Sequence, residues 1–571
     1  MLLNRRQLLS TGLTAAAITA AGRFTVAETA ARPDSATVAQ VSARLDQFIE
    51  QYMRDMKSPG MTLVMADRDG IQRVASYGLA DVERSRTVRS DELFQIGSIS
   101  KSFVALCLLQ LHDEGKLDLH KPVADYLPWF RVESRFAPIT THHLLTHTSG
   151  LPGNADVFLS DPADRHRAAS APGEYFHYNN MAFTLLGHLA WTLDGRELPE
   201  VIRRRILEPL GMTQTEPAIT LDVRQRTVKN YSAFQNDRPD TPSMRLSEAP
   251  GIIETSGAGC VASTAHDMGQ YIRMIANRGA SPNGRLVSKE SFALFSQPHI
   301  LAEEFGPSAH YGYGIAVDRL DGDAVVRHTG GMISFMSAIL VDIDRGLGAF
   351  ASINAMQDYR PTPVVQFAVQ LMKAATLRKN IADVPAPAGA RAGVGNGYAG
   401  VYEDVSGRKL VVTSTEGSLW LEHGAEQIAM EPTPEPDHFL VAHPDFAHFP
   451  LVFARQSDKD PQSAVTEVSW GGEWYAGSAY EGPRKFTYPP KWDSYIGHYR
   501  NESPWLGSTR VVVRKGRLWL DGVIPLEEAD DRFYLRDEEH SPEWLQFGPI
   551  VNGRCMLLKF SGVDMWRVAT T

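Results

Sequence analysis

Ser98 and Lys101 are residues whose types and spacing could do chemistry together. They stand at the head of an apolar run, residues 103–109, which predicts a helix buried in the middle of a domain. A separation of three residues puts both side chains on one helix face, so the amine can reach the hydroxyl. Unpaired N–H groups at the helix N-terminus favour the negative charge that develops on an attacked carbonyl. The pair predicts a serine nucleophile with a lysine beside it.

The Ser-x-x-Lys pattern alone is weak, because this chain contains it twice. Ser406 and Lys409 have the same spacing, in what reads as a turn between two strands. We interpret that second match as accidental. Further elements are needed to identify a site.

Tyr178 and Asn180 form the second element, inside a stretch that begins at Pro172. A phenol can shuttle a proton, and an amide can hold a lysine or a substrate carbonyl. The structural alternative is a helix start that an asparagine caps, with Tyr178 in the core.

The third element is the end of a predicted strand, residues 326–331, which contains His328, Gly330 and Gly331. Glycines there leave room for the backbone of a substrate. Alternation puts His328 and Gly330 on one face of the strand. Taken alone, a histidine in this setting is usually structural.

The three elements, in this order within one domain, resemble the superfamily of class C β-lactamases, DD-peptidases, D-aminopeptidases and related esterases. The motifs of that superfamily are Ser-x-x-Lys, Tyr-x-Asn and Lys/His-x-Gly. The resemblance covers about residues 41–371 and includes three supporting stretches, residues 115–128, 143–152 and 256–267.

This resemblance implies a mechanism. Ser98 attacks an amide, lactam or ester carbonyl and forms an acyl-enzyme, which water then releases. Lys101 and Tyr178 share the proton transfers, and Asn180 positions Lys101 and the acyl side chain. The N–H groups of Ser98 and Gly331 form the oxyanion hole, beside Gly330.

The resemblance requires no cofactor and no metal. His142, His143 and His147 form a cluster of a kind that can bind zinc. In the resembled family that stretch is structural. The three cysteines, Cys107, Cys260 and Cys555, show no metal-binding spacing, and we assign none of them to catalysis.

His328 bears on the substrate. A lysine at this position would be cationic and would attract a carboxylate, whereas an imidazole is mostly neutral at pH 7. The sequence therefore favours a D-aminopeptidase-like enzyme or an esterase. The alternatives are a penicillin-binding or peptidoglycan-sensing protein with little turnover and a true class C-like β-lactamase.

The chain divides into one mixed domain and two all-β domains. Residues 35–379 predict an α/β (α+β) domain of the β-lactamase type, an antiparallel sheet with helices, in which residues 61–66 and 71–77 form a hairpin. A linker rich in Pro, Ala and Gly follows over residues 380–396. Residues 397–483 and 491–571 predict two antiparallel, lipocalin-like barrels. A catalytic domain followed by two barrels is similar to the D-aminopeptidase arrangement.

An internal repeat supports the two barrels. Tyr398 and Tyr402 recur as Tyr495 and Tyr499, an offset of 97 residues (495 − 398). A Gly-x-Leu-Trp-Leu pattern at residues 417–421 recurs at residues 516–520. Each copy holds enough short strands for a small closed barrel.

The N-terminus carries Arg5 and Arg6 before an Ala-rich stretch without acidic residues, so residues 1–31 predict a twin-arginine signal peptide. The alternative is an amphipathic first helix. Export would make the protein periplasmic or secreted, without a stable membrane anchor. A net charge of −10 argues against a nucleic-acid partner and favours a small-molecule or short-peptide substrate. The oligomeric state stays open.

Overall fold

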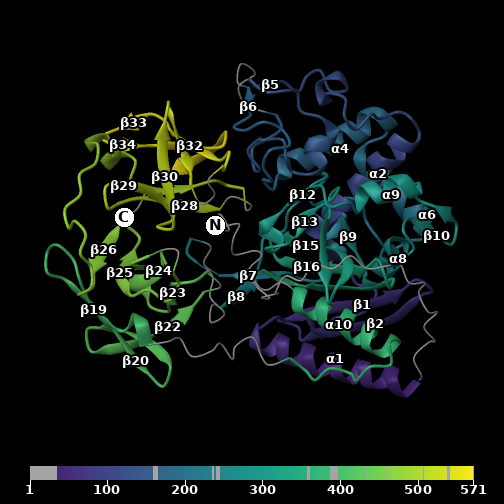
Figure 1. The fold of residues 1–571 in the computed structure, drawn as a ribbon, viewed down its shortest axis with the longest axis horizontal. Helices are drawn as coiled ribbons and strands as arrows, with labels where there is room; N and C mark the ends of the chain where they lie inside the picture. Colours follow the sequence, from purple (N-terminus) through teal and green to yellow (C-terminus); the bar gives the residue numbers. More distant parts are fainter. Residues whose placement is uncertain are drawn as a thin grey trace.

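The structure is a computed structural model. It describes residues 35–569 except 159–164, 235–236, 240–244, 357–360, 386–395, 434, 458–459, 504, 506 and 537–539. The predicted signal peptide and most of the predicted linker lie outside the described residues. No helix in the described part of the chain has the length and apolar character needed to cross a membrane. Figure 1 shows a domain of helices and sheet beside two groups of strands.

A nine-stranded sheet forms the middle of the first domain, and all neighbouring strands in it are antiparallel. In spatial order its strands are β12 (Ile300–Leu301), β13 (His310–Tyr311), β14 (Ala316–Leu320), β15 (Asp323–Met332), β16 (Phe335–Asp342), β17 (Leu347–Ile353), β1 (Gly60–Asp67), β2 (Ile71–Asp81) and β3 (Arg86–Thr87). The pairing of β1 with β2 confirms the predicted hairpin. Strands β16 and β17 are buried along their whole length, which indicates that both faces of the sheet are covered.

Helices cover the two faces of this sheet, as Figure 1 shows. Helices α1 (Ser35–Asp55) and α10 (Thr362–Thr376) pack together on one face, and α8 (Ala265–Ala276) packs on β1 and β17 from the other. Helix α2 (Ser100–Asp113) is buried almost all round between α4 (Asn180–Asp194) and its neighbours, which confirms the predicted buried helix. The shorter helices are α3 (Thr141–Leu145), α5 (Leu198–Ile202), α6 (Glu208–Leu210), α7 (Leu221–Arg226) and α9 (Lys289–Phe295).

Short strand pairs fix the loops around the N-terminus of α2. Strand β4 (Phe94–Gln95) pairs with β9 (Ala262–Ser263), so the chain that enters α2 and the loop before β9 lie side by side. The hydroxyl of Ser100 accepts a hydrogen bond from the Val261 N–H at 3.0 Å, which adds a second link. The other short strands are β5 (Val132–Glu133), β6 (His166–Arg167), β7 (Tyr231–Ala233), β8 (Leu246–Glu248), β10 (Ala280–Ser281), β11 (Gly284–Arg285) and β18 (Ala355–Met356).

The rest of the chain forms two closed antiparallel barrels, which confirms the predicted fold class. The first contains β19 (Gly400–Glu403), β20 (Lys409–Thr415), β21 (Ser418–His423), β22 (Glu426–Pro432), β23 (His438–Val441), β24 (Leu451–Arg455), β25 (Val465–Trp470) and β26 (Glu473–Ala476). The second contains β27 (Gly497–Arg500), β28 (Ser508–Arg514), β29 (Arg517–Leu520), β30 (Ile524–Ala529), β31 (Arg532–Leu535), β32 (Trp544–Phe547), β35 (Leu557–Phe560) and β36 (Val563–Arg567). A side hairpin of β33 (Ile550–Val551) and β34 (Arg554–Cys555) extends the second barrel.

The repeated tyrosines make equivalent hydrogen bonds in the two barrels. The Tyr402 hydroxyl donates to the backbone oxygen of Tyr398 at 2.8 Å, and the Tyr499 hydroxyl donates to that of Tyr495 at 2.7 Å. Each bond ties the first strand to the turn that precedes it. The leucines of the repeated Gly-x-Leu-Trp-Leu pattern point into the two barrel cores. The internal repeat therefore reflects two copies of one barrel fold.

Candidate active site

Ser98 lies in a single 3₁₀ turn, η2 (Gly97–Ile99), directly before α2. Gly97 has φ of +53°, in the left-handed region that glycine adopts most easily, and this conformation turns the chain from β4 into η2. Ser98 is half-buried, whereas Gly97 and Ile99 are fully buried. The serine hydroxyl is therefore the accessible group of this turn.

Lys101 is completely buried, and its ammonium group has three oxygen acceptors. Nζ lies 3.0 Å from Ser98 Oγ, 2.8 Å from Asn180 Oδ1 and 2.8 Å from the backbone oxygen of Ala258. Burial lowers the pKa of Lys101 from 10.5 to about 7, because a cation loses its hydration there. The lysine therefore contacts both its sequence neighbour and two distant segments.

Two adjacent asparagines have different roles at the N-terminus of α4. Asn179 is the N-cap, and its side-chain oxygen accepts from the Ala182 N–H at 2.7 Å. Asn180 is the first residue of the helix and directs its amide oxygen to Lys101. The predicted alternative is a helix start capped by an asparagine. Asn179 is that cap, while Asn180 faces the lysine.

Tyr178 joins the same group through its ring. The Lys101 Nζ atom lies 4.9 Å from the centre of that ring, within the range of a cation–π contact. The ring lies 4.5 Å from the His147 ring and 6.1 Å from the Phe305 ring, measured between centroids. The structure therefore brings Ser98, Lys101, Tyr178 and Asn180 together.

The backbone at the end of β15 packs directly against the backbone of η2 and the residue before it. A Cβ atom on Gly330 would lie 1.8 Å from the Ile96 carbonyl oxygen and 3.3 Å from the Ser98 nitrogen. A Cβ atom on Gly97 would lie 2.7 Å from the Gly331 carbonyl oxygen. No side chain fits between these two segments, so the glycines set the distance between β15 and the Ser98 turn.

The Gly330→Ala variant is therefore expected to displace the Ser98 turn. Overpacking of this kind costs about 1–3 kcal/mol, and loss of one oxyanion donor costs about 10²–10³-fold in kcat. Thermal unfolding and ester hydrolysis measure the two effects. Gly331→Ala is the matched steric control for stability, since its Cβ would come no closer than 3.4 Å to the Met336 sulfur. A Gly330→Ala variant as stable and as active as wild type would contradict this description.

His328 borders the site but has both ring nitrogens bonded within the protein. Its Nδ1 lies 2.5 Å from the Thr329 carbonyl oxygen, which can only accept, so Nδ1 carries the hydrogen. Its Nε2 lies 2.9 Å from the hydroxyl of Tyr311. Burial raises the pKa of Tyr311 well above its ordinary value, so this phenol keeps its proton. His328 is buried, and both of its ring nitrogens lie within hydrogen-bond distance of groups in the protein.

The histidines near α3 make hydrogen bonds within the domain. His142 Nδ1 lies 2.8 Å from the Tyr313 hydroxyl, and His143 closes a capping box at the start of α3. His147 Nδ1 accepts from the Asn179 N–H at 3.0 Å. Burial lowers the pKa of His142 to about 4. These contacts hold the loop beside the Tyr178 stretch.

Within the described residues, the side chains with metal-binding spacing lie elsewhere, on the first barrel. Ligand atoms of His423, His443 and Asp445 all lie within 4.8 Å of one another. His423 Nε2 already lies 2.9 Å from Asp445 Oδ2, and His443 Nδ1 accepts from the Asp445 N–H at 3.2 Å. The three residues therefore make a hydrogen bond and a turn cap.

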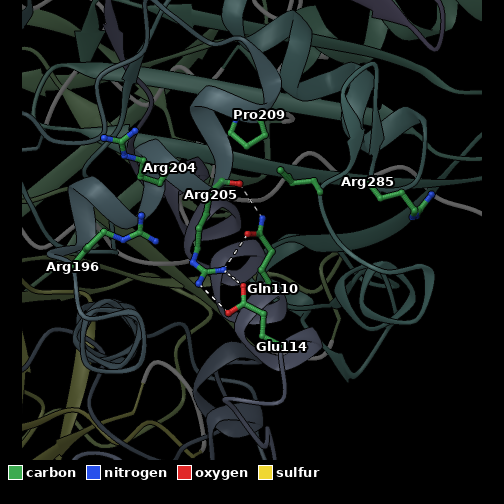
Figure 2. A pocket seen from close by; sticks show the side chains of 8 residues that line it. Gln110, Glu114, Arg196, Arg204, Arg205, Pro209 and Arg285 are labelled. Carbon is green, nitrogen blue, oxygen red and sulfur yellow. Dashed lines mark hydrogen bonds and ion pairs between the residues drawn. The ribbon is translucent and has the colours of Figure 1, made fainter.

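A pocket at the other end of α2 is built from ion pairs (Figure 2). The Arg205 guanidinium lies 2.6 Å from Glu114 and 2.5 Å from Asp194, and Figure 2 shows it pointing toward Glu114 and Gln110. Gln110 is 12 residues beyond Ser98, about 18 Å along a helix. This network ties the C-terminal end of α2 to the turn that contains Arg205, away from the serine.

The second Ser-x-x-Lys match differs in every structural respect. Ser406 lies in an exposed turn between β19 and β20, and its hydroxyl donates to Asp404 Oδ1 at 2.8 Å. The Lys409 amine lies 3.9 Å from Glu403.

Three residues of the site escape sequence reasoning. Ala258 contributes only its backbone oxygen, Asn154 accepts from Asn180 Nδ2 at 3.2 Å, and Tyr311 binds His328. The stretch 256–267 was part of the family resemblance, so it signalled the Ala258 loop. Nothing in the sequence pattern signalled Asn154 or Tyr311.

Known proteins resemble the first domain of this chain. A family model described as Beta-lactamase matches residues 45–369. The chain is 30% identical over 325 residues to Esterase EstB of Burkholderia gladioli, a match that covers 50% of this chain and 81% of EstB. It is 26% identical over 282 residues to the putative penicillin-binding protein PbpX of Bacillus subtilis, covering 48% of this chain and 65% of PbpX, just under two thirds of that protein.

Two solved structures show the fold. The octameric penicillin-binding protein homologue from Pyrococcus abyssi has a TM-score of 0.54 at 21% identity, covering 86% of this chain and 98% of that one. EstCE1, a hydrolase with promiscuous acyltransferase activity, has a TM-score of 0.50 at 20% identity, covering 60% of this chain and 100% of that one. The first likeness reaches beyond residues 45–369.

Proposed function

The chain belongs to the Beta-lactamase family of serine hydrolases, and from this premise we propose that it hydrolyses esters, and amides of small acyl groups, through an acyl-enzyme on Ser98. The observation that carries the proposal is the group of hydrogen bonds made by the Lys101 amine. A buried amine with a pKa of about 7 lies 3.0 Å from an accessible serine hydroxyl. Such a pair supports a nucleophile with its own base.

The two other contacts of Lys101 orient its lone pair. A neutral amine has two hydrogens and one lone pair. The Asn180 and Ala258 oxygens can only accept, so they take the two hydrogens, and the lone pair faces Ser98 Oγ. As Oγ attacks the carbonyl carbon, its proton passes to Nζ. With a pKa of about 7, a large fraction of Lys101 is neutral at neutral pH.

The remaining steps follow from the groups around the serine. The N–H groups of Ser98 and Gly331 receive the charge on the carbonyl oxygen as the tetrahedral intermediate forms. The proton on Lys101 then passes by way of Tyr178 to the leaving alcohol or amine, and the carbon–oxygen or carbon–nitrogen bond breaks. Water then attacks the acyl carbon and gives its proton to the base. The bond between the acyl carbon and Ser98 Oγ breaks, Oγ takes that proton back, and the acid is released.

His328 supports a preference for uncharged substrates. An imidazole is mostly neutral at pH 7, and both nitrogens of His328 contact protein groups, the Thr329 carbonyl and the Tyr311 hydroxyl. The site therefore lacks at this position the cation that would attract the carboxylate of a penicillin or a peptide. We assign to His328 the positioning of the β15 end rather than proton transfer.

D-aminopeptidase-like action is the second candidate. A catalytic domain followed by two barrels is the arrangement that resembles D-aminopeptidase, and both barrels are present. Esterase action is preferred because the relative that matches at 30% identity is named an esterase. A penicillin-binding protein with little turnover and a true β-lactamase remain the alternatives to be tested.

A substrate panel tests the proposal. We expect kcat/KM for short p-nitrophenyl esters to exceed that for nitrocefin by at least about tenfold, the equivalent of about 1.4 kcal/mol of lost attraction for the carboxylate. D-alanine amides measure the second candidate in the same assay. Nitrocefin winning by orders of magnitude would refute the ranking. A persistent adduct without turnover would favour the penicillin-binding alternative.

Export by the twin-arginine route remains part of the proposal. It rests on Arg5, Arg6 and the acid-free stretch that follows them. A periplasmic or secreted enzyme would meet small-molecule or short-peptide substrates outside the cytoplasm. The negative net charge of the chain supports the absence of a nucleic-acid partner from this proposal.

A further inference from the structure

The second barrel places a buried carboxylate against the first domain, next to the Tyr178–Asn180 stretch. Glu543, just before β32, is only 4% exposed. Its Oε1 atom accepts from the backbone N–H of Gly153 at 2.7 Å and lies 3.1 Å from Nε2 of His177. Its Oε2 atom accepts from the Ser561 hydroxyl at 2.5 Å. The carboxylate therefore has partners in both domains.

A neighbouring contact fixes the same segment. The His540 ring stacks on the Tyr175 ring with centroids 3.8 Å apart. Tyr175 and His177 lie on either side of Phe176, just before Tyr178. A buried carboxylate is stable only when it is hydrogen-bonded, and charge-assisted bonds of this kind are strong and directional. Residues 540–543 thus dock onto residues 175–177 and onto Gly153.

From Gly153 a chain of bonds leads to the nucleophile. The Gly153 carbonyl oxygen accepts from the N–H groups of Asn180 and Met181, at 2.8 and 3.1 Å. The next residue, Asn154, accepts from Asn180 Nδ2, which leaves Asn180 Oδ1 turned to Lys101. Lys101 in turn contacts Ser98. Glu543 therefore holds Gly153, and Gly153 with Asn154 orients Asn180, whose amide contacts the lysine.

We propose that Glu543 is a positioning residue of the hydrolytic site, through which the second barrel holds the Gly153–Asn154 loop and thereby Asn180 and Lys101. The inference rests on the proposed function, because it concerns the efficiency of the Ser98 reaction. It gives the second barrel a part in turnover in addition to packing. A base displaced by about 1 Å can cost about 10²-fold in rate, so the loop position matters.

A second contact between the same two domains supplies the control. Arg510, on β28, pairs with Asp237 at 3.3 Å and donates to the Asp237 backbone oxygen. Asp237 lies in a segment far in sequence from Gly153 and Asn180. Arg510→Met removes a barrel contact of similar polarity without touching the Gly153 loop. Arg510→Met therefore shows what a weaker contact between the second barrel and the first domain does to kcat when the Gly153 loop is left in place.

Two substitutions of similar size test the carboxylate in the full-length protein. Glu543→Gln keeps an oxygen acceptor for the Gly153 N–H, whereas Glu543→Leu removes it. We expect Glu543→Leu to lower kcat for a p-nitrophenyl ester about 10- to 100-fold with KM changed less than about twofold. We expect Glu543→Gln to recover kcat to within about threefold, and Arg510→Met to leave kcat within about twofold.

A double-mutant cycle covers the case in which Glu543→Leu folds poorly. Asn154→Ala breaks the same chain of bonds from inside the first domain and should lower kcat similarly. Glu543→Ala removes the carboxylate without introducing a bulky side chain. In the Asn154→Ala, Glu543→Ala double variant the two losses of kcat should fail to multiply, because both act on Asn180.

The inference is overturned if Glu543→Leu folds and keeps wild-type kcat, or if Glu543→Leu and Arg510→Met lower kcat equally. An additive cycle overturns it as well. A Ser98→Ala protein that keeps its activity would instead overturn the proposed function, whatever the Glu543 variants do.

Discussion

The Ser98→Ala variant is expected to lose ester hydrolysis by about 10³-fold or more while it stays folded. Removing the nucleophile of a serine hydrolase abolishes the acyl-enzyme route, and only binding and the oxyanion donors continue to act. The substitution removes one oxygen atom from a half-buried turn, and Lys101 keeps its contacts with Asn180 and Ala258. Initial rates with a p-nitrophenyl ester measure the loss, and thermal unfolding checks the fold.

Ser406→Ala is the matched control for this experiment. Ser406 begins the other Ser-x-x-Lys pattern but lies in an exposed turn of the first barrel. Its loss should leave the rate unchanged. Residual activity in Ser98→Ala within tenfold of wild type would show that another group does the chemistry.

The Lys101→Met variant is expected to lower kcat/KM by about 10²–10⁴-fold, the range that a general base supplies. Wild-type activity should rise with pH through about 7, because the lysine acts as a base only when it is neutral and its pKa is about 7. Below that pH the activity should fall about tenfold for each pH unit. Methionine keeps the length of the side chain without the amine, so this acid limb should vanish in the variant.

The stability of Lys101→Met provides an independent check. Because folding lowers the lysine pKa from 10.5 to about 7, the folded state binds fewer protons than the unfolded state between these values. The contribution of Lys101 to stability therefore improves as pH rises from 7 to 10.5 and is least favourable below 7. Removing the amine should leave the protein at least as stable as wild type at pH 7.

Lys409→Met is the matched control for the lysine. Lys409 completes the accidental pattern in the first barrel, and its substitution should change neither the rate nor the pH profile. A wild-type profile that stays flat between pH 5.5 and 8.5 would contradict Lys101 as the base. An acid limb near pH 7 that persists in Lys101→Met would contradict it equally.

Much of the fold follows from local patterns in the sequence. The hairpin of β1 and β2 and the buried helix α2 come from the periodicity of apolar residues, which each element must satisfy on its own. The two barrels follow from the repeated tyrosines, whose hydrogen bonds recur in both copies. The strand order of the sheet could not be predicted in this way, because β1 lies between β2 and β17, which is distant in the sequence. Contacts across such a separation leave no local signal.

The site divides in the same way. Ser98 and Lys101 lie one turn apart, so their spacing predicts their contact. Asn180 reaches Lys101 across 79 residues, and only the family resemblance joined the two motifs. Glu543 reaches Gly153 across 390 residues, at a place where neither residue belongs to a motif. Backbone acceptors such as Ala258 are invisible to reasoning from side-chain type.

Mass spectrometry of the protein after a brief pulse of p-nitrophenyl ester tests the central claim most directly. The account predicts that the intact mass rises by the mass of the acyl group, that peptide mapping places the group on Ser98, and that Ser98→Ala gains nothing. An acyl group found on another residue, or hydrolysis that proceeds at full rate with the Ser98 peptide never labelled, would contradict it.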